Sequence, residues 1–327
     1  MASSAHIPVL IDDVLELMAP RAGGIYCDGT LGRGGHTRAL LERSAPDGRV
    51  VAVDRDPEAI AAVAGLSSQE GDRLLVVHGR FGDLPAVLAR LGVGPVDGIL
   101  LDLGVSSPQL DVPERGFSFM RSGPIDMRMD PTTGPTALEL IADLTHPELA
   151  AVLRDLGEER LHHKIARRLK EAVKAGELAT TLDLARAVAS CFSAHDLRKL
   201  HLHPATRTFQ ALRIAVNAEL DELTSFLATF PDLLAPGGRC VVISFHSLED
   251  RLVKRRFREL AWTSSLPPKL AAGVGERVAA VCTPLTRKAV FADDDETDDN
   301  PRARSARLRA CQRTTAPNVP PQSHPSR

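Results

Sequence analysis

The sequence predicts an α/β fold built on a parallel sheet with helices on both faces. Strand-like apolar runs alternate with helical patterns from Ile25 to Val105, and this alternation is typical of parallel sheets. An acidic residue lies at the carboxyl end of three of these runs: Asp28, Asp54 and Asp102. Because ligands of doubly wound sheets bind at the carboxyl ends of the strands, these acids mark the expected binding edge.

The individual elements follow from local patterns. Apolar runs predict strands at 25–28, 50–54, 74–78 and 98–103, with helices from about 37, from 57 to about 64 and from about 84 to 91. The segment from about 138 to 202 is helical in pattern and has no strand-like run. Apolar residues at steps of three and four then predict one long helix over roughly 206–227. A turn at Ala235-Pro236-Gly237-Gly238 leads into a strand over 239–245, where the α/β pattern resumes.

This helical segment is predicted to be an inserted domain. We place it at 111–204, with 1–110 and 205–327 forming one discontinuous α/β domain. Between Arg154 and Arg213 the chain carries twelve basic and seven acidic residues, although the whole chain has a formal charge of only −2. The local surplus indicates where a basic binding surface should be sought. The Pro/Ser-rich last dozen residues are expected to be disordered.

Composition restricts the class of protein. A chain of 327 residues that is 43% hydrophobic can form two domains, or one with a large insertion. The five scattered cysteines include no Cys-x-x-Cys pair, which predicts reduced thiols in a cytoplasmic protein and no zinc site. No apolar run approaches a membrane span, so we expect no membrane association. His201 and His203 lack further ligand residues nearby, and no metal is expected.

A glycine-rich loop, Asp28-Gly29-Thr30-Leu31-Gly32-Arg33-Gly34-Gly35-His36, joins the first strand to its helix. Its glycines would let the backbone approach a ligand closely, although a purely structural turn is the alternative. Asp54 follows Gly34 by twenty residues, where nucleotide-binding folds place an acid on ribose hydroxyls. Thr37 stands where the dinucleotide fingerprint has its last glycine, so a pyrophosphate is not clearly expected. The loop and Asp54 together favour an adenosine-containing cofactor.

Two further segments carry polar groups that have both a structural and a functional interpretation. Asp102 and Ser106 could cap a following helix, but no helix-like pattern follows directly, which favours a functional role. Ser247-Leu248-Glu249-Asp250 predicts a capping box that opens a helix. The basic residues beyond it form either a solvated helix face or a surface for phosphates, and the basic stretch from Arg154 to Arg213 favours the second.

Nine ordered motifs between residue 6 and about 310 resemble the bacterial S-adenosylmethionine-dependent ribosomal RNA small-subunit methyltransferase H family, also called MraW. The motifs are His6-Ile7-Pro8-Val9-Leu10, the glycine loop, Asp54-Arg55-Asp56-Pro57, Leu101-Asp102-Leu103-Gly104-Val105-Ser106-Ser107-Pro108-Gln109-Leu110-Asp111, Arg115-Gly116-Phe117-Ser118-Phe119, Asp126-Met127-Arg128-Met129-Asp130, His203-Pro204-Ala205-Thr206-Arg207-Thr208-Phe209-Gln210, Ser244-Phe245-His246-Ser247-Leu248-Glu249-Asp250-Arg251, and Asn300-Pro301-Arg302-Ala303-Arg304-Ser305. The resemblance implies a class I (Rossmann-like) methyltransferase sheet with an inserted helical substrate-binding domain. It also implies methyl transfer from S-adenosyl-L-methionine to the exocyclic N4 amine of a cytidine in 16S ribosomal RNA at the decoding centre.

The resemblance also implies roles for single residues. Cofactor contacts fall on Gly34, Gly35, His36, Asp54, Phe81, Asp102 and Gln109, of which Phe81 and Gln109 come from the resemblance alone. The wider class of amino-methyltransferases carries an Asp/Asn-Pro-Pro-aromatic motif that this chain lacks at Asp102, so the group that positions the amine is left open between Asp102 and Ser106, with Asn217 and His246 behind them. The candidate RNA contacts are Arg207, Arg251, Lys254 and Arg255. The implied partner is the small ribosomal subunit, and a homodimer is left open.

Three other function classes remain to be weighed against this one. A nicotinamide-dependent oxidoreductase would share the sheet and Asp54, but the incomplete fingerprint and the basic stretch from Arg154 to Arg213 argue against it. A non-catalytic ribosome-assembly factor would not need every cofactor position to be filled, as it is here. A methyltransferase acting on cytosine in another nucleic acid such as DNA is the nearest enzymatic alternative.

Overall fold

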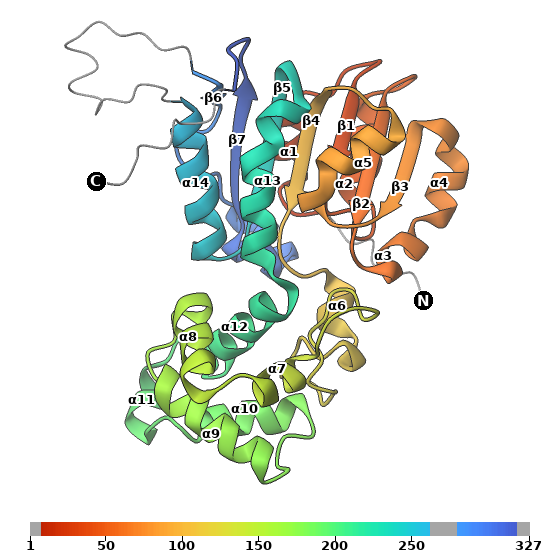
Figure 1. The fold of residues 1–327 in the computed structure, drawn as a ribbon. Helices are drawn as coiled ribbons and strands as arrows, with labels where there is room; N and C mark the ends of the chain where they lie inside the picture. Colours follow the sequence, from red (N-terminus) through yellow and green to blue (C-terminus); the bar gives the residue numbers. More distant parts are fainter. Residues whose placement is uncertain (1–7, 262–279, 319–327) are drawn as a thin grey trace, which may run out of the picture. The chain divides into compact units, whose positions relative to one another are not determined.

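The computed structural model describes residues 8–261 and 280–318. The chain forms two compact units (Figure 1): Met1–Gly104 with Glu222–Arg327, and Val105–Asp221. Within the described ranges, no helix is long and apolar enough to cross a membrane. His6 and Ile7 of the first motif, and most of the tail expected to be disordered, lie outside these ranges.

The first unit is built on a seven-stranded sheet with the order β3-β2-β1-β4-β5-β7-β6. β1 to β5 are parallel, as the sequence predicts, whereas β7 is antiparallel to both β5 and β6. The sheet is therefore mixed, and the sequence did not predict its antiparallel edge. Its strands are β1 (Ile25–Asp28), β2 (Arg49–Asp54), β3 (Leu74–His78), β4 (Val96–Asp102), β5 (Leu234–Ser244), β6 (Cys282–Pro284) and β7 (Arg307–Arg313).

Helices cover both faces of this sheet (Figure 1). Side chains alternate along β4, so that Ile99 and Leu101 join a core with α5, α13 and α14, while Leu100 joins a second core with α1 and α2. The result is the three-layered Rossmann-like arrangement expected from the alternating sequence pattern. The helices that belong wholly or mainly to this unit are α1 (Ile11–Met18), α2 (Gly35–Arg43), α3 (Pro57–Ala62), α4 (Ala64–Glu70), α5 (Leu84–Leu91), α13 (Glu219–Leu233), α14 (Ser247–Ala261) and α16 (Asp294–Asp299), with short 3-10 turns at Gly71–Arg73, Phe81–Asp83 and Pro301–Ser305.

The second unit consists of helices around a core of its own. Its helices are α6 (Ser107–Asp111), α7 (Ala137–Asp143), α8 (His146–Gly157), α9 (His162–Lys174), α10 (Thr181–Ala189), α11 (Ala194–Lys199) and α12 (Thr206–Asn217), with a 3-10 turn at Pro113–Arg115. Reciprocal capping boxes open α7, α8, α10 and α11, each with Ser or Thr at the cap and an acid three residues later. These boxes satisfy amides that the first turn of each helix would otherwise leave without acceptors.

This helical unit extends beyond the predicted insertion of 111–204 at both ends. At its C-terminal end it includes α12, which packs against α8. A Cβ atom added at Gly157 would lie 2.6 Å from the backbone oxygen of Arg207, so the two helices approach within a distance that only glycine permits. Close packing on α8 is the physical reason why α12 belongs to the helical unit.

The prediction of a single helix over 206–227 is wrong, because the chain forms two helices there. The chain is helical on both sides of Ala218, but Ala218 itself adopts φ 49° and ψ 40°, in the left-handed region. α12 therefore ends at Asn217, and α13 begins at Glu219. The apolar spacing continues across this break, so the pattern gave no sign of it.

Candidate active site

The glycine loop crosses the carboxyl ends of the central strands and is fixed there by backbone hydrogen bonds. The amide of Gly29 donates to the carbonyl of Leu100 on β4, and that of Leu31 donates to Val53 on β2. Gly32 and Gly34 have φ angles of 52° and 75°, a conformation in which glycine is favoured. A Cβ atom added at Gly35 would lie 2.4 Å from Cγ of Pro8. The loop thus needs glycine for its turns and for close packing, which supports the structural alternative, and its ligand-binding role stays a prediction.

Asp54 connects this loop to the end of β2. Its Oδ2 accepts a hydrogen bond from the Gly32 amide at 2.8 Å, and its Oδ1 accepts one from the Asp56 amide at 2.8 Å. Burial raises the pKa of Asp54 to about 6, although both hydrogen bonds favour the carboxylate. Each carboxylate oxygen has two lone pairs, so both retain capacity for another donor such as a hydroxyl.

His36 and Asp102 face each other where α2 begins and β4 ends. Nδ1 of His36 lies 3.8 Å from Oδ2 of Asp102, and Nε2 of His36 donates to the carbonyl of Val9 at 3.0 Å. Burial raises the pKa of Asp102 to about 6; the nearby His36 opposes this shift, and Asp28 and Glu249 add to it. Oδ1 of Asp102 is buried, and no hydrogen bond from a described residue reaches it. A buried carboxylate oxygen of this kind has the chemistry of an acceptor for an incoming N–H or O–H group.

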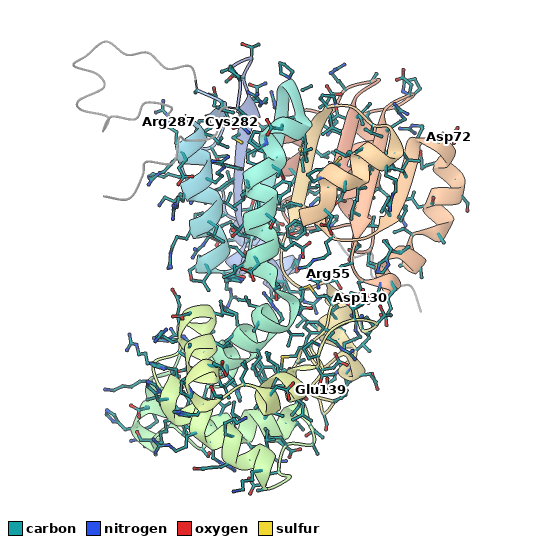
Figure 2. The ribbon with its side chains drawn as sticks, viewed as in Figure 1. Arg55, Asp72, Asp130, Glu139, Cys282 and Arg287 are labelled. Carbon is teal, nitrogen blue, oxygen red and sulfur yellow. The ribbon has the colours of Figure 1, made fainter. Side chains whose placement is uncertain are left out.

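Phe81 follows β3 and is held by a buried carboxylate from α13. Its ring packs edge-to-face on Phe226, with the ring centroids 6.0 Å apart. Glu222, whose side chain is only 2% exposed, lies 3.0 Å from Nε of Arg80 and 3.2 Å from Nη1 of Arg55. Arg55, labelled in Figure 2, directly follows Asp54 in the chain. Glu222 therefore connects the turn that carries Phe81 with the segment after β2.

Ser106 and Gln109 belong to the second unit and form a structure that the sequence did not favour. Ser106 is the N-cap of the short helix α6, and its amide donates to Oε1 of Gln109 at 2.9 Å in a reciprocal capping box. The expectation that no helix follows Asp102 directly is therefore wrong, and the capping interpretation describes what both side chains do here. Their predicted roles in catalysis and cofactor binding remain predictions.

The buried side chain of Asn217 joins the segment around Met127 to α12 by hydrogen bonds within the second unit. Its Oδ1 accepts from the Met129 amide at 2.7 Å, and its Nδ2 donates to the carbonyls of Met127 and Arg213 at 2.7 and 2.8 Å. The side chain fixes the motif around Met127, where the backbone has a φ of 62°. These bonds occupy both amide hydrogens, so Asn217 is better explained as a structural residue than as a group that positions an amine.

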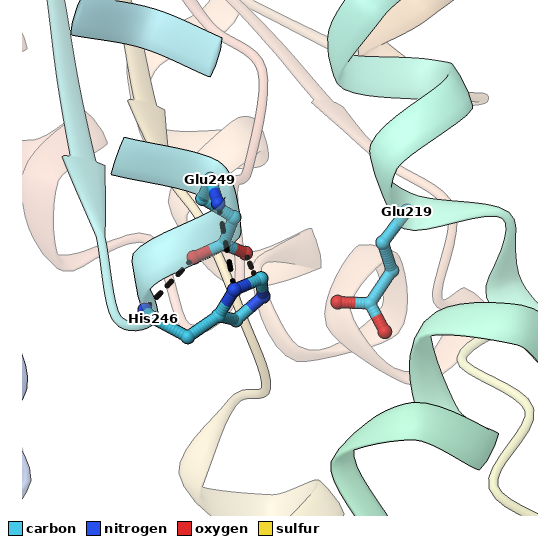
Figure 3. A group of neighbouring side chains, drawn as sticks. All are labelled: Glu219, His246 and Glu249. Atoms are coloured by element: carbon cyan, nitrogen blue, oxygen red, sulfur yellow. Dashed lines mark hydrogen bonds and ion pairs between the residues drawn. The ribbon is translucent and has the colours of Figure 1, made fainter. Parts of the chain in front are cut away.

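His246 and Glu249 cap the start of α14 (Figure 3). The amide of His246 donates to Oε2 of Glu249 at 3.3 Å, and the amide of Glu249 donates to Nδ1 of His246 at 3.4 Å. Nε2 of His246 lies 3.1 Å from Oε1 of Glu249. A capping box therefore opens this helix, but it starts one residue earlier than the one predicted at Ser247, because the helix itself begins at Ser247.

The candidate RNA contacts are exposed side chains. Arg251, Lys254 and Arg255 lie on the solvent-exposed part of α14, and Arg255 pairs with Glu259 at 2.8 Å. Arg207, in the second unit, is also exposed and donates to the carbonyl of Glu158 at 2.9 Å. His203 stacks on Phe119 with ring centroids 4.5 Å apart. The exposure of these cations fits both a phosphate-binding surface and a solvated helix face, so their role in RNA binding stays a prediction.

Comparison with known proteins identifies the family. The model of the MraW methylase family matches residues 3–314, which is nearly the whole chain. The chain belongs to the MraW methylase family. Among curated MraW relatives, the protein named ribosomal RNA small subunit methyltransferase H from Sorangium cellulosum is 50% identical over 308 residues, covering 94% of this chain and 90% of that one. The protein of the same name from Methylococcus capsulatus is also 50% identical over 308 residues, covering 94% and 100% of the two chains.

The match to the MraW methylase family model confirms both the family and the α/β methyltransferase fold that the motifs predict. The glycine loop, Asp54, His36 and Asp102 meet at the carboxyl ends of β1, β2 and β4, three strands that are adjacent in the sheet. Sequence reasoning missed Glu222, because nothing in its local pattern distinguishes it from the other acids of α13.

Proposed function

We propose that this methylase transfers a methyl group from S-adenosyl-L-methionine to the exocyclic N4 amine of a cytidine in 16S ribosomal RNA, at the decoding centre of the small ribosomal subunit. The observation that carries this proposal is the 50% identity to proteins named ribosomal RNA small subunit methyltransferase H, which extends over at least 90% of both chains. Similarity across both the sheet and the helical insertion supports a common substrate as well as a common reaction.

The described residues fit the proposed cofactor. S-adenosyl-L-methionine supplies an electrophilic methyl group on a positively charged sulfur. Asp54 offers carboxylate lone pairs to ribose hydroxyls, and its hydrogen bond with the Gly32 amide keeps the glycine loop beside it. Phe81 offers an aromatic face to adenine. The buried Oδ1 of Asp102, which lacks a donor among the described residues, suits a cofactor N–H group. The acids Asp28, Asp54 and Asp102 also favour a cationic ligand.

The residues of the chain contribute mainly by positioning the amine. The lone pair of cytosine N4 is delocalised into the ring, so the amine must be held in line with the methyl group. Asp102 is our first candidate for this role, because a carboxylate with a pKa near 6 can accept a hydrogen bond from the amine and later its proton. Ser106 is the second candidate. Alignment of this kind can contribute about 7–11 kcal/mol to lowering the barrier.

The RNA would be held by the exposed cations Arg207, Arg251, Lys254 and Arg255 and by the basic stretch from Arg154 to Arg213. A base in folded RNA must turn out of its stack before it reaches a cofactor at the sheet edge, which costs about a few kcal/mol. Phosphate contacts on either side of the base would offset this cost.

The decisive experiment measures transfer of labelled methyl from S-adenosyl-L-methionine to small ribosomal subunits that lack the modification, followed by nucleoside analysis of the digested RNA. The proposal predicts label on cytidine N4 at a single site. Naked 16S ribosomal RNA and cytosine-containing DNA are offered in parallel. Label on DNA, or on another atom of the RNA, would contradict the proposed substrate, and binding of NADH in place of S-adenosyl-L-methionine would contradict the reaction.

A further inference from the structure

The acidic run from Asp293 to Asp299 is not explained by the proposed reaction. Its residues 294–299 form α16, which Asp293 caps by accepting a hydrogen bond from the Glu296 amide at 2.8 Å. The chain that follows is anchored in the core, because Ala303 and Ala306 are fully buried in the same cluster as Leu10. The acidic helix is therefore a built part of the first unit, attached to the segment next to β7.

Glu296 contacts the start of the described chain, which is far from it in the sequence. Its Oε1 accepts a hydrogen bond from the backbone amide of Leu10 at 2.6 Å. Leu10 precedes α1 and adopts φ 53° and ψ 38°, a left-handed conformation that a leucine seldom adopts. A hydrogen bond to a charged acceptor is stronger than one to a neutral acceptor, so this bond stabilises the left-handed conformation in which the Leu10 amide reaches Glu296. Glu296 thus fixes the direction in which the chain enters α1.

The residues just before Leu10 contact the glycine loop and His36. The carbonyl of Val9 accepts the hydrogen bond from Nε2 of His36, and Pro8 packs against Gly35. A carbonyl oxygen can only accept, so Nε2 must carry the hydrogen. In neutral His36 the lone pair is then on Nδ1, the nitrogen that faces Asp102 at 3.8 Å. The position of the Val9 carbonyl therefore determines which tautomer His36 adopts. It thereby also determines whether the Nδ1 that faces Asp102 carries a hydrogen.

We propose that Glu296 is a positioning residue for the cofactor site. By holding the Leu10 amide, it places the Val9 carbonyl so that His36 keeps its proton on Nε2 and presents Nδ1 to Asp102. The consequence for cofactor affinity rests on the proposed function, in which His36 and Asp102 contact S-adenosyl-L-methionine. The consequence for the imidazole itself is a property of the protein alone.

The test compares three variants of the full chain. Glu296→Ala removes the acceptor, whereas Glu296→Gln keeps an Oε1 that can accept from Leu10. Asp295→Asn is the matched control, because it removes the same charge from an exposed neighbour on the same helix. Glu296→Asp, which shortens the side chain by one methylene, replaces the alanine variant if that one does not fold. Each variant is examined by ¹⁵N NMR of the His36 ring, by calorimetry with S-adenosyl-L-methionine and by thermal unfolding.

We expect Glu296→Ala to shift His36 from the single Nε2–H form to a mixture of tautomers and to weaken cofactor binding about tenfold, or about 1.4 kcal/mol. The Gln and Asn variants should match the wild type in both measurements. A wild-type His36 spectrum in Glu296→Ala would overturn the proposal, even if the melting temperature falls. If the wild-type protein binds no S-adenosyl-L-methionine, the proposed function fails, while the NMR comparison still tests the link from Glu296 to His36.

Discussion

Asp54 Oδ2 accepts a hydrogen bond from the Gly32 amide at 2.8 Å, so the acid proposed to bind the ribose also fixes the glycine loop. Its other oxygen accepts from the Asp56 amide, which belongs to the turn into α3. One carboxylate thus connects the glycine loop with the turn into α3. This double role means that substitutions at Asp54 should affect both ligand binding and the local backbone.

Asp54→Ala should abolish measurable binding of S-adenosyl-L-methionine. The variant would lose the two hydrogen bonds that the ribose hydroxyls donate to this carboxylate, at about 1.5–3 kcal/mol each. The affinity for S-adenosyl-L-methionine should therefore fall at least about a hundredfold. Calorimetry on the purified variant measures this directly. Asp72→Asn, at an exposed acid of the same unit, is the control and should bind normally. Unchanged affinity in Asp54→Ala would remove this residue from the ribose site.

Cofactor affinity should fall as the pH decreases through about 6. Burial raises the pKa of both Asp54 and Asp102 to about 6, so both are ionised above that pH and become neutral below it. The ionised forms attract the sulfonium charge and accept hydrogen bonds, and protonation removes both effects. Calorimetry between pH 5 and 8 should show this loss, and Asp102→Asn should make the dependence shallower. Affinity that stays constant across this range would contradict the assignment.

The same two pKa values predict the opposite slope for the stability of the ligand-free protein. A carboxyl group whose pKa is higher in the folded than in the unfolded state binds protons more tightly when folded. The free energy of unfolding should therefore decrease as the pH rises from about 4 to 6, by on the order of 3 kcal/mol for each group. Urea unfolding of the wild type and of Asp102→Asn measures the share of Asp102 as the difference between the two slopes. Equal slopes would contradict the raised pKa.

Gly35→Ala should lower both the stability of the fold and the affinity for S-adenosyl-L-methionine. The new methyl group would lie 2.4 Å from Cγ of Pro8, so the 8–10 segment or the start of α2 must move. Overpacking of this kind costs about 1–3 kcal/mol. Gly65→Ala is the control, because no atom lies within 4 Å of the added Cβ in α4, and helix propensity predicts a gain of up to about 1 kcal/mol. Thermal unfolding of the two variants should show shifts of opposite sign.

The sequence predicts the central strands well because they are apolar runs, three of which end in an acid. β1 and β3 have the predicted bounds, and α5 matches its predicted range of 84–91. β7 was missed because it reads Arg307-Leu308-Arg309-Ala310-Cys311-Gln312-Arg313, with charges that do not resemble a buried strand. Arg309 is accommodated by its ion pair with Asp250 at 2.6 Å, a long-range contact that a local pattern does not contain.

The proposed site was predictable to the extent that motifs carry it. The glycine loop, Asp54 and Asp102 lie at strand ends, and the parallel topology brings strand ends together. Glu222 and Glu296 act through partners 142 and 286 residues away, Arg80 and Leu10. Ala218 interrupts a helix without any change in apolar spacing. These features depend on tertiary contacts or on a single backbone dihedral angle, and neither leaves a periodic trace in the sequence.

Glu222→Ala should destabilise the first unit and weaken cofactor binding together. The buried carboxylate pairs with Arg55 and with the partly exposed Arg80, and loss of a hydrogen bond to a charged group costs about 1.5–3 kcal/mol. The turn that carries Phe81 then loses its anchor. Glu222→Gln retains the size and one acceptor oxygen and should be milder in both measurements. Glu259→Gln, in an exposed pair with Arg255, is the control. Wild-type stability of the alanine variant would show that the pair is not a structural anchor.

Replacing Arg251 and Arg255 together with Ala should raise the KM for the small ribosomal subunit without changing the affinity for S-adenosyl-L-methionine. Both cations are exposed on α14, where they can neutralise RNA phosphates, and each lost phosphate contact reduces the salt dependence of binding. The KM of the double variant should therefore depend less steeply on salt than that of the wild type. Arg90→Ala, at an exposed position of α5, removes a comparable charge and serves as the control. An unchanged KM at every salt concentration would mean that this face of α14 is only a solvated surface.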